Sequence, residues 1–173
     1  MVILLANVEV QIAQLAARIE KQLRALGKQR VLVGIPEDKA ARSDPAMNNA
    51  YLGAIHENGS PVRNIPPRPF LHPGVQKAQP RVVKKLETAC ANAVKDANFD
   101  PQKALGDAGM LARNSVRGMF DNNDWPPDKP ITQRIKNLKH GKPPDAAVQT
   151  LVDTRQLRKS IHYVIVDESE AKS

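Results

Sequence analysis

The N-terminal part of the chain carries one stripe of apolar residues whose spacing alternates between three and four positions. Such a stripe covers one face of a helix, and Gly27 follows it as a helix-ending residue. The stripe is interrupted at Gln22 and drifts toward Leu23, which is typical of a helix packed on a small domain and less so of a long coiled coil. We therefore expect a core helix whose buried face consists of Leu5, Val8, Ile12, Leu15, Ile19 and Leu26.

Two short runs rich in β-branched residues lie near opposite ends of the chain. Val31–Ile35 is closed by Pro36, and Ile161–Val166 precedes the acidic C-terminal residues. Both runs are typical of strands, and their pairing would bring the two ends of the chain together. We expect one small, mostly antiparallel sheet from these runs, with Arg68–Leu71 as a candidate third strand.

Helix-starting and helix-ending residues predict further helices between the two strands. Ser43–Pro45 can cap and start a second helix, and Asn58–Gly59 can end it. A third helix starts at Pro73, and Asp100–Pro101 caps and starts a fourth that runs to about Phe120. We expect these last two helices to form a hairpin. Its inner face is rich in Ala and Gly, so the two backbones can approach closely.

Two proline-dense stretches interrupt this pattern. Residues 61–80 hold six of the fourteen prolines, which is incompatible with a central strand, so residues 61–73 are interpreted as an extended arm. Residues 121–150 hold five prolines without a convincing apolar period, which predicts a long loop, either functional or disordered. The basic residues of this loop are Lys129, Arg134, Lys136, Lys139 and Lys142.

The C-terminal residues complete an α+β fold. Asp153, followed three positions later by Gln156, resembles the capping box of a short helix. We expect residues 1–173 to form a single α+β domain, a small and mostly antiparallel sheet covered by helices. The Pro-rich arm at 61–73 and the basic loop at 121–150 would project from it.

Composition limits the core, the partners and the compartment. With three Phe, two Tyr and one Trp, the core must be filled by aliphatic side chains. The net charge of +8, with +4 in residues 61–100 and +3 in residues 101–145, favours an acidic partner, nucleic acid included. The single cysteine, Cys90, excludes an intramolecular disulfide and a Cys-based zinc site. Because Met1–Leu5 is too short for a signal peptide and no window approaches the roughly 20 apolar residues of a membrane span, we expect a soluble protein without membrane contact.

No motif predicts catalysis. His56–Glu57 begins like a metalloprotease helix, but Ser60 stands where the second histidine is needed. Asp121–Trp125 lacks the third oxygen ligand and the glycine of a calcium loop, and His140–Pro143 lacks the hydroxyl residue of a phosphate-binding loop. Cys90 lies in an Ala-rich stripe with no base nearby in sequence. We expect no catalytic residue, no cofactor, no metal and no enzymatic activity.

Two sequence blocks are more specific. The first combines VGIP with AYLGAIHENGSPVRNIPPRPFLHPGV at Ala50–Val75. The second combines NDWPP at Asn123–Pro127 with LVDTRQLRKSIHYVIV at Leu151–Val166. Together, over about half of the chain, they resemble the tail-completion or virion morphogenesis proteins of long-tailed bacteriophages. Arg155 replaces the glycine of the family motif, so either that turn is helical here or the cap geometry at Gln156 differs.

The resemblance implies a non-enzymatic structural protein of the phage neck, synthesised in the bacterial host cytoplasm and located in the virion. It implies a homo-oligomeric ring at the head–tail junction that contacts head-completion and tail-terminator proteins and makes the tail competent to join the head. The motif residues implicated in subunit or partner contacts are Arg63, Ile65, Arg68, Phe70, Leu71 and Trp125. Those with a structural role in the motif are Gly59, Asp153, Thr154, Gln156, Leu157 and Ser160.

Physical reasoning leaves two alternatives for the anchors. An arm fixed by proline loses little entropy on docking, so Phe70 and Leu71 could fill a neighbour's pocket. Phe70 could equally cap the sheet of its own domain. Arg63 and Arg68 could pair with acidic groups of a partner or of the domain itself. Trp125 could anchor the long loop on the domain or insert into another subunit.

The basic loop leaves a further alternative. Arg134, Lys136, Lys139 and Lys142 could contact DNA inside the ring without sequence preference. A different class of function is a non-enzymatic, basic nucleic-acid-binding protein. The loop has no interleaved aromatic residues for base stacking and no recognition helix, so charge alone supports both hypotheses. A solvated basic arm explains the pattern equally well.

Overall fold

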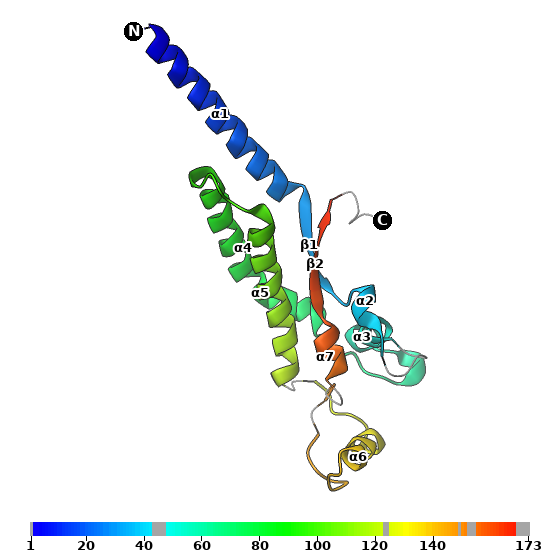
Figure 1. The fold of residues 1–173 in the computed structure, drawn as a ribbon. Helices are drawn as coiled ribbons and strands as arrows, with labels where there is room; N and C mark the ends of the chain where they lie inside the picture. Colours follow the sequence, from blue (N-terminus) through cyan, green and yellow to red (C-terminus); the bar gives the residue numbers. More distant parts are fainter. Residues whose placement is uncertain (1, 43–47, 123–124, 149, 152–154, 169–173) are drawn as a thin grey trace. The chain divides into compact units, whose positions relative to one another are not determined.

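The computed structural model describes residues 2–42, 48–122, 125–148, 150–151 and 155–168. These residues have an α+β fold that is mostly helical and contains a small antiparallel sheet (Figure 1). In chain order the elements are α1 (Val2–Gly27), β1 (Gln29–Gly34), α2 (Glu37–Ala40), α3 (Asn49–Asn58), a 3₁₀ turn (Pro61–Arg63), α4 (Leu71–Lys95), α5 (Pro101–Asn122), α6 (Pro130–Lys139), α7 (Gln156–Ser160) and β2 (His162–Asp167).

The sheet is formed by β1 and β2 alone among the described residues. This pairing confirms that the two β-branched runs near opposite ends of the chain are neighbours. The prediction of a third strand at Arg68–Leu71 is wrong, because Leu71 already begins α4. The physical reason is that the Glu57 carboxylate accepts the backbone N–H groups of Phe70 and Leu71, and this cap starts a helix there. The Pro-rich arm therefore ends at Phe70.

The helix predicted at the N-terminus is present as α1, but the expected burial of its stripe is wrong for its first half. The side chains of Val8, Ile12 and Leu15 are 46%, 60% and 45% exposed. Ile19 and Leu26, farther along the helix, are half-buried. The spacing of apolar residues defined the face correctly, but spacing does not determine what covers a face.

The helical hairpin is confirmed as α4 and α5. Asp100 caps α5, since its Oδ1 accepts the backbone N–H groups of Gln102 (2.9 Å) and Lys103 (3.3 Å). The α4 and α5 backbones approach closely at Gly74, where an added Cβ would lie 2.6 Å from the Cα of Val116. The buried residues of the hairpin include Ala78, Ala89, Ala93, Leu105, Ala108 and Ala112, which confirms its small-residue lining.

The helix before this hairpin also ends as expected. Gly59 follows α3 with φ +76°, and its N–H donates to the Ile55 carbonyl at 2.7 Å. The start expected at Ser43–Pro45 lies outside the described residues. The observed N-cap is Asn48, whose side chain accepts the N–H of Tyr51. A turn at Gly59 with positive φ thus separates α3 from the proline-dense segment.

The prediction of an uninterrupted loop at 121–150 is wrong, because α6 occupies its centre. Pro130 stands at the first position of this helix, where a missing N–H has no cost. Ile131, Ile135 and Leu138 follow at spacings of four and three, which is a helical period. The sequence prediction missed this short period because it lies among basic residues and flanking prolines.

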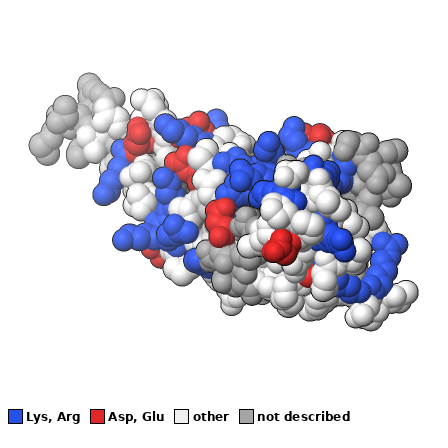
Figure 2. All heavy atoms as spheres, turned by 90° about the horizontal axis from the view of Figure 1, so that it is seen from below, with Lys and Arg blue, Asp and Glu red and all other residues white. Residues whose placement is uncertain are grey.

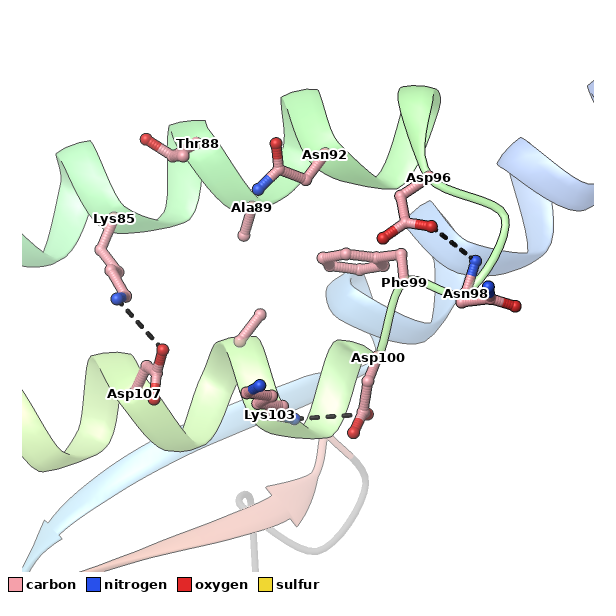
Figure 3. Close-up of a pocket in the computed structure, with 11 residues that line it drawn as sticks. Lys85, Thr88, Ala89, Asn92, Asp96, Asn98, Phe99, Asp100, Lys103 and Asp107 are labelled. Carbon is pink, nitrogen blue, oxygen red and sulfur yellow. Dashed lines mark hydrogen bonds and ion pairs between the residues drawn. The ribbon is translucent and has the colours of Figure 1, made fainter.

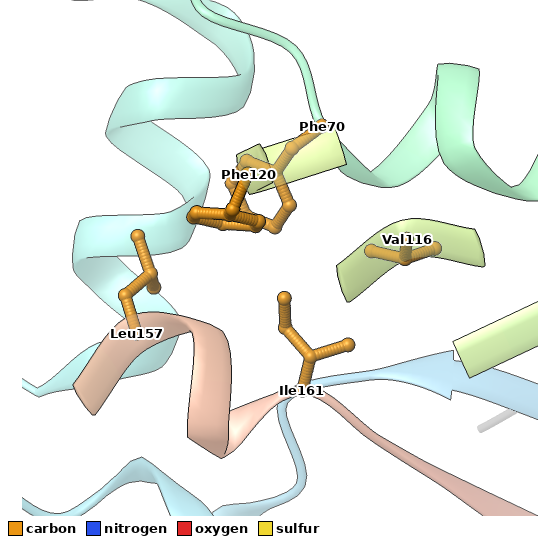
Figure 4. Close-up of a cluster of buried hydrophobic side chains, with 5 residues drawn as sticks. All are labelled: Phe70, Val116, Phe120, Leu157 and Ile161. Atoms are coloured by element: carbon orange, nitrogen blue, oxygen red, sulfur yellow. The ribbon is translucent and has the colours of Figure 1, made fainter. Parts of the chain in front are cut away.

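The chain divides into two compact units, and each is described by itself. Unit 1 comprises the described residues within 1–32, 79–111 and 164–173, and unit 2 those within 33–78 and 112–163. Unit 2 holds a buried cluster of Phe70, Val116, Phe120, Leu157 and Ile161 (Figure 4). The ring centroids of Phe70 and Phe120 are 4.9 Å apart. That all of residues 1–173 form a single domain stays a prediction.

The contact at Gly74 generates a matched pair of substitutions. Gly74→Ala should destabilise the protein by about 1–3 kcal/mol, because the new methyl group meets the α5 backbone. Gly118→Ala, also in a helix but with nothing within 4 Å of its added Cβ, should stabilise it by about 0.5–1 kcal/mol. Urea unfolding followed by circular dichroism measures both. Equal stability of the Gly74→Ala variant and the wild type would contradict this packing.

Candidate partner-binding interface

Glu57 joins the end of α3 to the start of α4. Its Oε2 accepts the N–H groups of Phe70 (2.8 Å) and Leu71 (2.9 Å), and its Oε1 accepts the N–H of His72 (2.9 Å). A carboxylate at a helix N-terminus satisfies otherwise unpaired donors and complements the helix dipole. Nothing in the local sequence pattern indicated this role, because the cap acts across thirteen to fifteen positions. Glu57 therefore fixes the point at which the Pro-rich segment ends.

Arg68 lies at the centre of the site and is only 5% exposed. Its Nε donates to the carbonyl of Pro126 (3.0 Å), and its Nη2 donates to the carbonyl of Pro127 (3.0 Å). The same Nη2 lies 3.2 Å from Oδ1 of Asp128. The planar guanidinium can make these contacts together because its donors are fixed in a fork. Arg68 thus connects the Pro-rich segment at residues 61–70 to the Trp-Pro-Pro segment, Trp125–Pro127.

Asp128 extends this network into α6. Its Oδ2 lies 2.7 Å from the Nζ of Lys136, and its backbone carbonyl accepts a hydrogen bond from the Gln133 side chain at 2.6 Å. The Asp128 side chain is 8% exposed, so its charge is screened little by water. A buried carboxylate needs such partners, because leaving it unpaired is strongly destabilising. We call Arg68, Asp128 and Lys136 the buried ion network.

The aromatic anchors have partners within their own chain. Trp125 Nε1 donates to the Pro69 carbonyl at 2.9 Å, and its ring lies edge-on to Phe120 at 5.6 Å between centroids. Phe70 is 2% exposed in the core of unit 2, and Leu71 packs against that core. Of the alternatives left open by the sequence, the structure shows the intramolecular contacts for Phe70, Trp125 and Arg68. Contacts of these residues with other subunits stay a prediction.

The orientation of α6 is the reverse of an ordinary surface helix. Gln133, Lys136 and Asn137 face the rest of unit 2, where the Asn137 amide donates to the carbonyls of Pro144 (3.2 Å) and Ala146 (2.8 Å) and is almost completely buried. The opposite face is apolar and faces solvent, with Ile131 62%, Ile135 59% and Leu138 62% exposed. Amphipathic helices normally bury the apolar face. We call Ile131, Ile135 and Leu138 the α6 outer face.

The basic residues predicted to face DNA do not act as one group. Arg134, Lys139 and Lys142 are exposed, whereas Lys136 is held in the buried ion network. Figure 2 shows Lys and Arg side chains in several separate groups on the face that it displays. Contact with DNA stays a prediction, but Lys136 contributes to the structure of unit 2.

The remaining predicted motif residues occupy structural positions. Arg63 is exposed in the 3₁₀ turn, and Ile65 closes an antiparallel bridge with Ser60. Leu157 and Ser160 are buried in α7, where the Ser160 hydroxyl donates to the Leu157 carbonyl at 2.7 Å.

The predicted cap of α7 is only partly described. Asp153 and Thr154 lie outside the described residues. Arg155 stands at the N-cap with φ 59°, and its own side chain makes no capping hydrogen bond to the helix that Gln156 begins. A left-handed backbone favours glycine, which is the residue that the resembled motif has at this position. The backbone at Arg155 is therefore left-handed and not helical.

Outside this part of unit 2, the hollows and charged groups of the described residues do not form a second candidate site. A hollow of about 340 Å³ in unit 1 lies between α4 and α5, where Lys85 and Asp107 form an exposed ion pair at 3.1 Å (Figure 3). Among the described residues, no three His, Cys, Asp or Glu side chains come together as metal ligands. In the same part of the chain, no helix is both long and apolar enough to cross a bilayer.

His56 lies beside the buried ion network, and its pKa is lowered from 6.5 to about 4. Burial is the main cause, and the nearby Arg68 cation adds to it, although Asp128 acts in the opposite direction. Its Nδ1 is buried without a hydrogen-bond partner among the described residues. A hollow of about 200 Å³ adjoins the ring and has room for water. His56 is therefore neutral in the folded protein at neutral pH.

The lowered pKa predicts a loss of stability in acid. The unfolded state takes up a proton at His56 first, so stability falls as pH drops from 6.5 toward about 4. The slope contributed by His56 is at most about 1.4 kcal/mol for each pH unit. Urea unfolding at several pH values should show a shallower slope for His56→Gln than for the wild type. Equal slopes would show that this imidazole does not titrate on unfolding.

Comparison with known proteins identifies no family. An uncharacterized protein of Methanocaldococcus jannaschii is 43% identical over 43 residues, which is 23% of this chain and 32% of that protein. The match thus spans about a third of the archaeal protein. No family model and no solved structure matches this chain.

Proposed function

We propose that this protein is a virion structural protein of a long-tailed bacteriophage, a neck or tail-completion subunit. It forms a homo-oligomeric ring at the head–tail junction and makes the tail competent to join the head. The support is the resemblance of its two sequence blocks to that family, together with how the residues of these blocks contact one another. The chemistry required is binding and assembly.

The observation that carries the proposal is the meeting of the two blocks in unit 2. Arg68 and Pro69 belong to the first block, and Trp125–Pro127 belong to the second, which lies more than fifty residues farther along the chain. Phe70 of the first block packs in the same core as Leu157 of the second. The residues that carry the resemblance therefore support one another physically. If the resemblance were due to chance, the two blocks would not need to contact each other.

The α6 outer face supports a role in assembly. Three large apolar side chains held outward by a buried polar face cost free energy in water, and burying such side chains returns about 1.5–3 kcal/mol each. Residues 129–144 contain no Asp or Glu, and four of their five Lys or Arg are exposed, namely Lys129, Arg134, Lys139 and Lys142. A neighbouring protein with an apolar patch and an acidic rim fits this surface, because complementary charge aligns partners. Repetition around a ring would multiply a weak contact.

Phage genetics tests the proposal directly. A phage with a stop codon in this gene should produce filled heads beside unattached tails in electron micrographs of lysates. A plasmid with the wild-type gene should restore complete particles. Normal particles from the stop-codon phage without a plasmid would reject the proposed function.

The same complementation tests the α6 outer face. The variant Ile131→Gln, Ile135→Gln, Leu138→Gln should fold normally, because these side chains are exposed, but should reduce complete particles at least about tenfold. Val83→Gln, a matched change at a 46% exposed valine of α4, should complement like the wild type. If the triple variant also complements fully, α6 is not an assembly surface, although the neck function can still hold.

A further inference from the structure

In the first half of α1, the apolar stretch at residues 8–17 is exposed. Every residue from Val8 to Ala17 is exposed, and Figure 1 shows this half of α1 extending beyond the α4–α5 hairpin of the same unit. From residue 2 to residue 17 the polar residues are Asn7, Glu9, Gln11 and Gln14, and there is no Lys or Arg. A helix that is apolar around most of its circumference is normally buried. Something outside unit 1 would have to cover it.

The apolar stripe of α1 repeats every seven residues. Ile12 and Ile19 occupy the first position of successive heptads, and Val8 and Leu15 occupy the fourth. A seven-residue repeat with these positions apolar is the pattern of a coiled coil. Ile12 at the first position with Leu15 at the fourth is the combination that favours two parallel strands. The stripe therefore provides a hydrophobic face and also determines how two such helices would align along their length.

The second half of the stripe already has contacts within unit 1. Gln22, at the fourth position of its heptad, donates from Nε2 to the carbonyls of Asp96 and Ala97 at the tip of the α4–α5 hairpin. Ile19 and Leu26 are half-buried. The interruption at Gln22 is thus where α1 changes from an open helix to a packed one. The part that the structure shows exposed is Val8–Ala17.

We propose that the first half of α1 pairs with α1 of a second copy of this chain as a parallel, in-register, two-stranded coiled coil. Identical stripes are complementary to each other in this arrangement, so Ile12 meets Ile12 and Leu15 meets Leu15. Glu9 is the one charge in residues 2–17, and in a parallel pair its flanking position faces that of Leu4, so no like charges meet.

The other occupants of this face fit less well. An interfacial lipid-binding helix carries Lys or Arg on its polar face, and this half of α1 has neither. The α6 outer face, by contrast, is poorly suited to self-association. Its basic residues would bring like charges together when two copies meet. The coiled coil does not rest on the proposed phage function, because it follows from α1 alone. The coiled coil would be a surface through which dimers could assemble into a larger ring.

Sedimentation of the full-length protein tests the pairing. All variants carry Cys90→Ser, because Cys90 is exposed and could form a disulfide of its own. The parent protein should dimerise reversibly, with a dissociation constant in the micromolar to submillimolar range. Ile12→Glu should weaken dimerisation at least about tenfold. At a concentration where the parent is monomeric, it should leave the thermal unfolding midpoint unchanged, because Ile12 is exposed in the single chain. Gln14→Glu, on the opposite side of the helix, should dimerise like the parent.

Disulfide crosslinking tests the register. Ile12→Cys should form a covalent dimer under mild oxidation, because first-position residues meet their own copies only in a parallel, in-register pair. Gln14→Cys, equally exposed but outside the seam, should crosslink far less at the same concentration. Equal crosslinking of both variants would overturn the proposed register.

Three further outcomes would overturn the proposal. They are a parent protein that is monomeric throughout, a dimer that Ile12→Glu leaves intact, and a monomer that binds phosphatidylglycerol vesicles through α1. The last outcome would make lipid the occupant. None of these results bears on the stop-codon phage, so failure of the coiled coil and failure of the neck function are distinguishable.

Discussion

The buried ion pair between Arg68 and Asp128 is the interaction on which unit 2 depends. Prolines lie next to both residues of this pair and lack backbone N–H groups. The segment therefore has few donors of its own for the carbonyls of Pro126 and Pro127. The Arg68 fork supplies these donors and neutralises Asp128 at the same time. Removing one partner of such a pair leaves an uncompensated charge in a site with little water, which costs more than the intact pair contributes. The network therefore fixes the Pro-rich segment and the Trp-Pro-Pro segment as one structure.

Once Asp128 is fixed, the orientation of α6 follows. The Asp128 carboxylate binds Lys136 and its carbonyl binds Gln133, so the polar side of α6 must face inward and its apolar side outward. Two exposed apolar surfaces among the described residues then differ in charge. The α6 outer face has a basic rim and suits an unlike, acidic partner. The first half of α1 carries almost no charge and suits a copy of itself. The proposed neck function would use both kinds of contact, one for the oligomer of this protein and one for its neighbours.

The sequence predicted what depends on local signals and missed what depends on distant ones. Gly59 ends α3 and Asp100 starts α5 as expected, because caps act over a few residues. The pairing of β1 with β2 followed from two apolar runs. The Arg68–Asp128 pair joins residues about sixty positions apart, and the Glu57 cap crosses a helix boundary, so no local pattern contains either. The helix α6 was missed because its apolar period is short and lies among prolines and lysines. The burial of α1 was predicted wrongly because a stripe does not reveal its cover.

Hydrogen exchange of α6 tests most directly whether Arg68 holds this arrangement. Arg68→Met should increase exchange in residues 130–139 and leave β1 and β2 protected, because α6 loses the anchor of its inner face. Arg63→Met, at an exposed arginine of the same proline-dense segment, should leave exchange in α6 as in the wild type. Unchanged protection of α6 in Arg68→Met would contradict the account, because the helix would then be held by contacts other than the buried ion network.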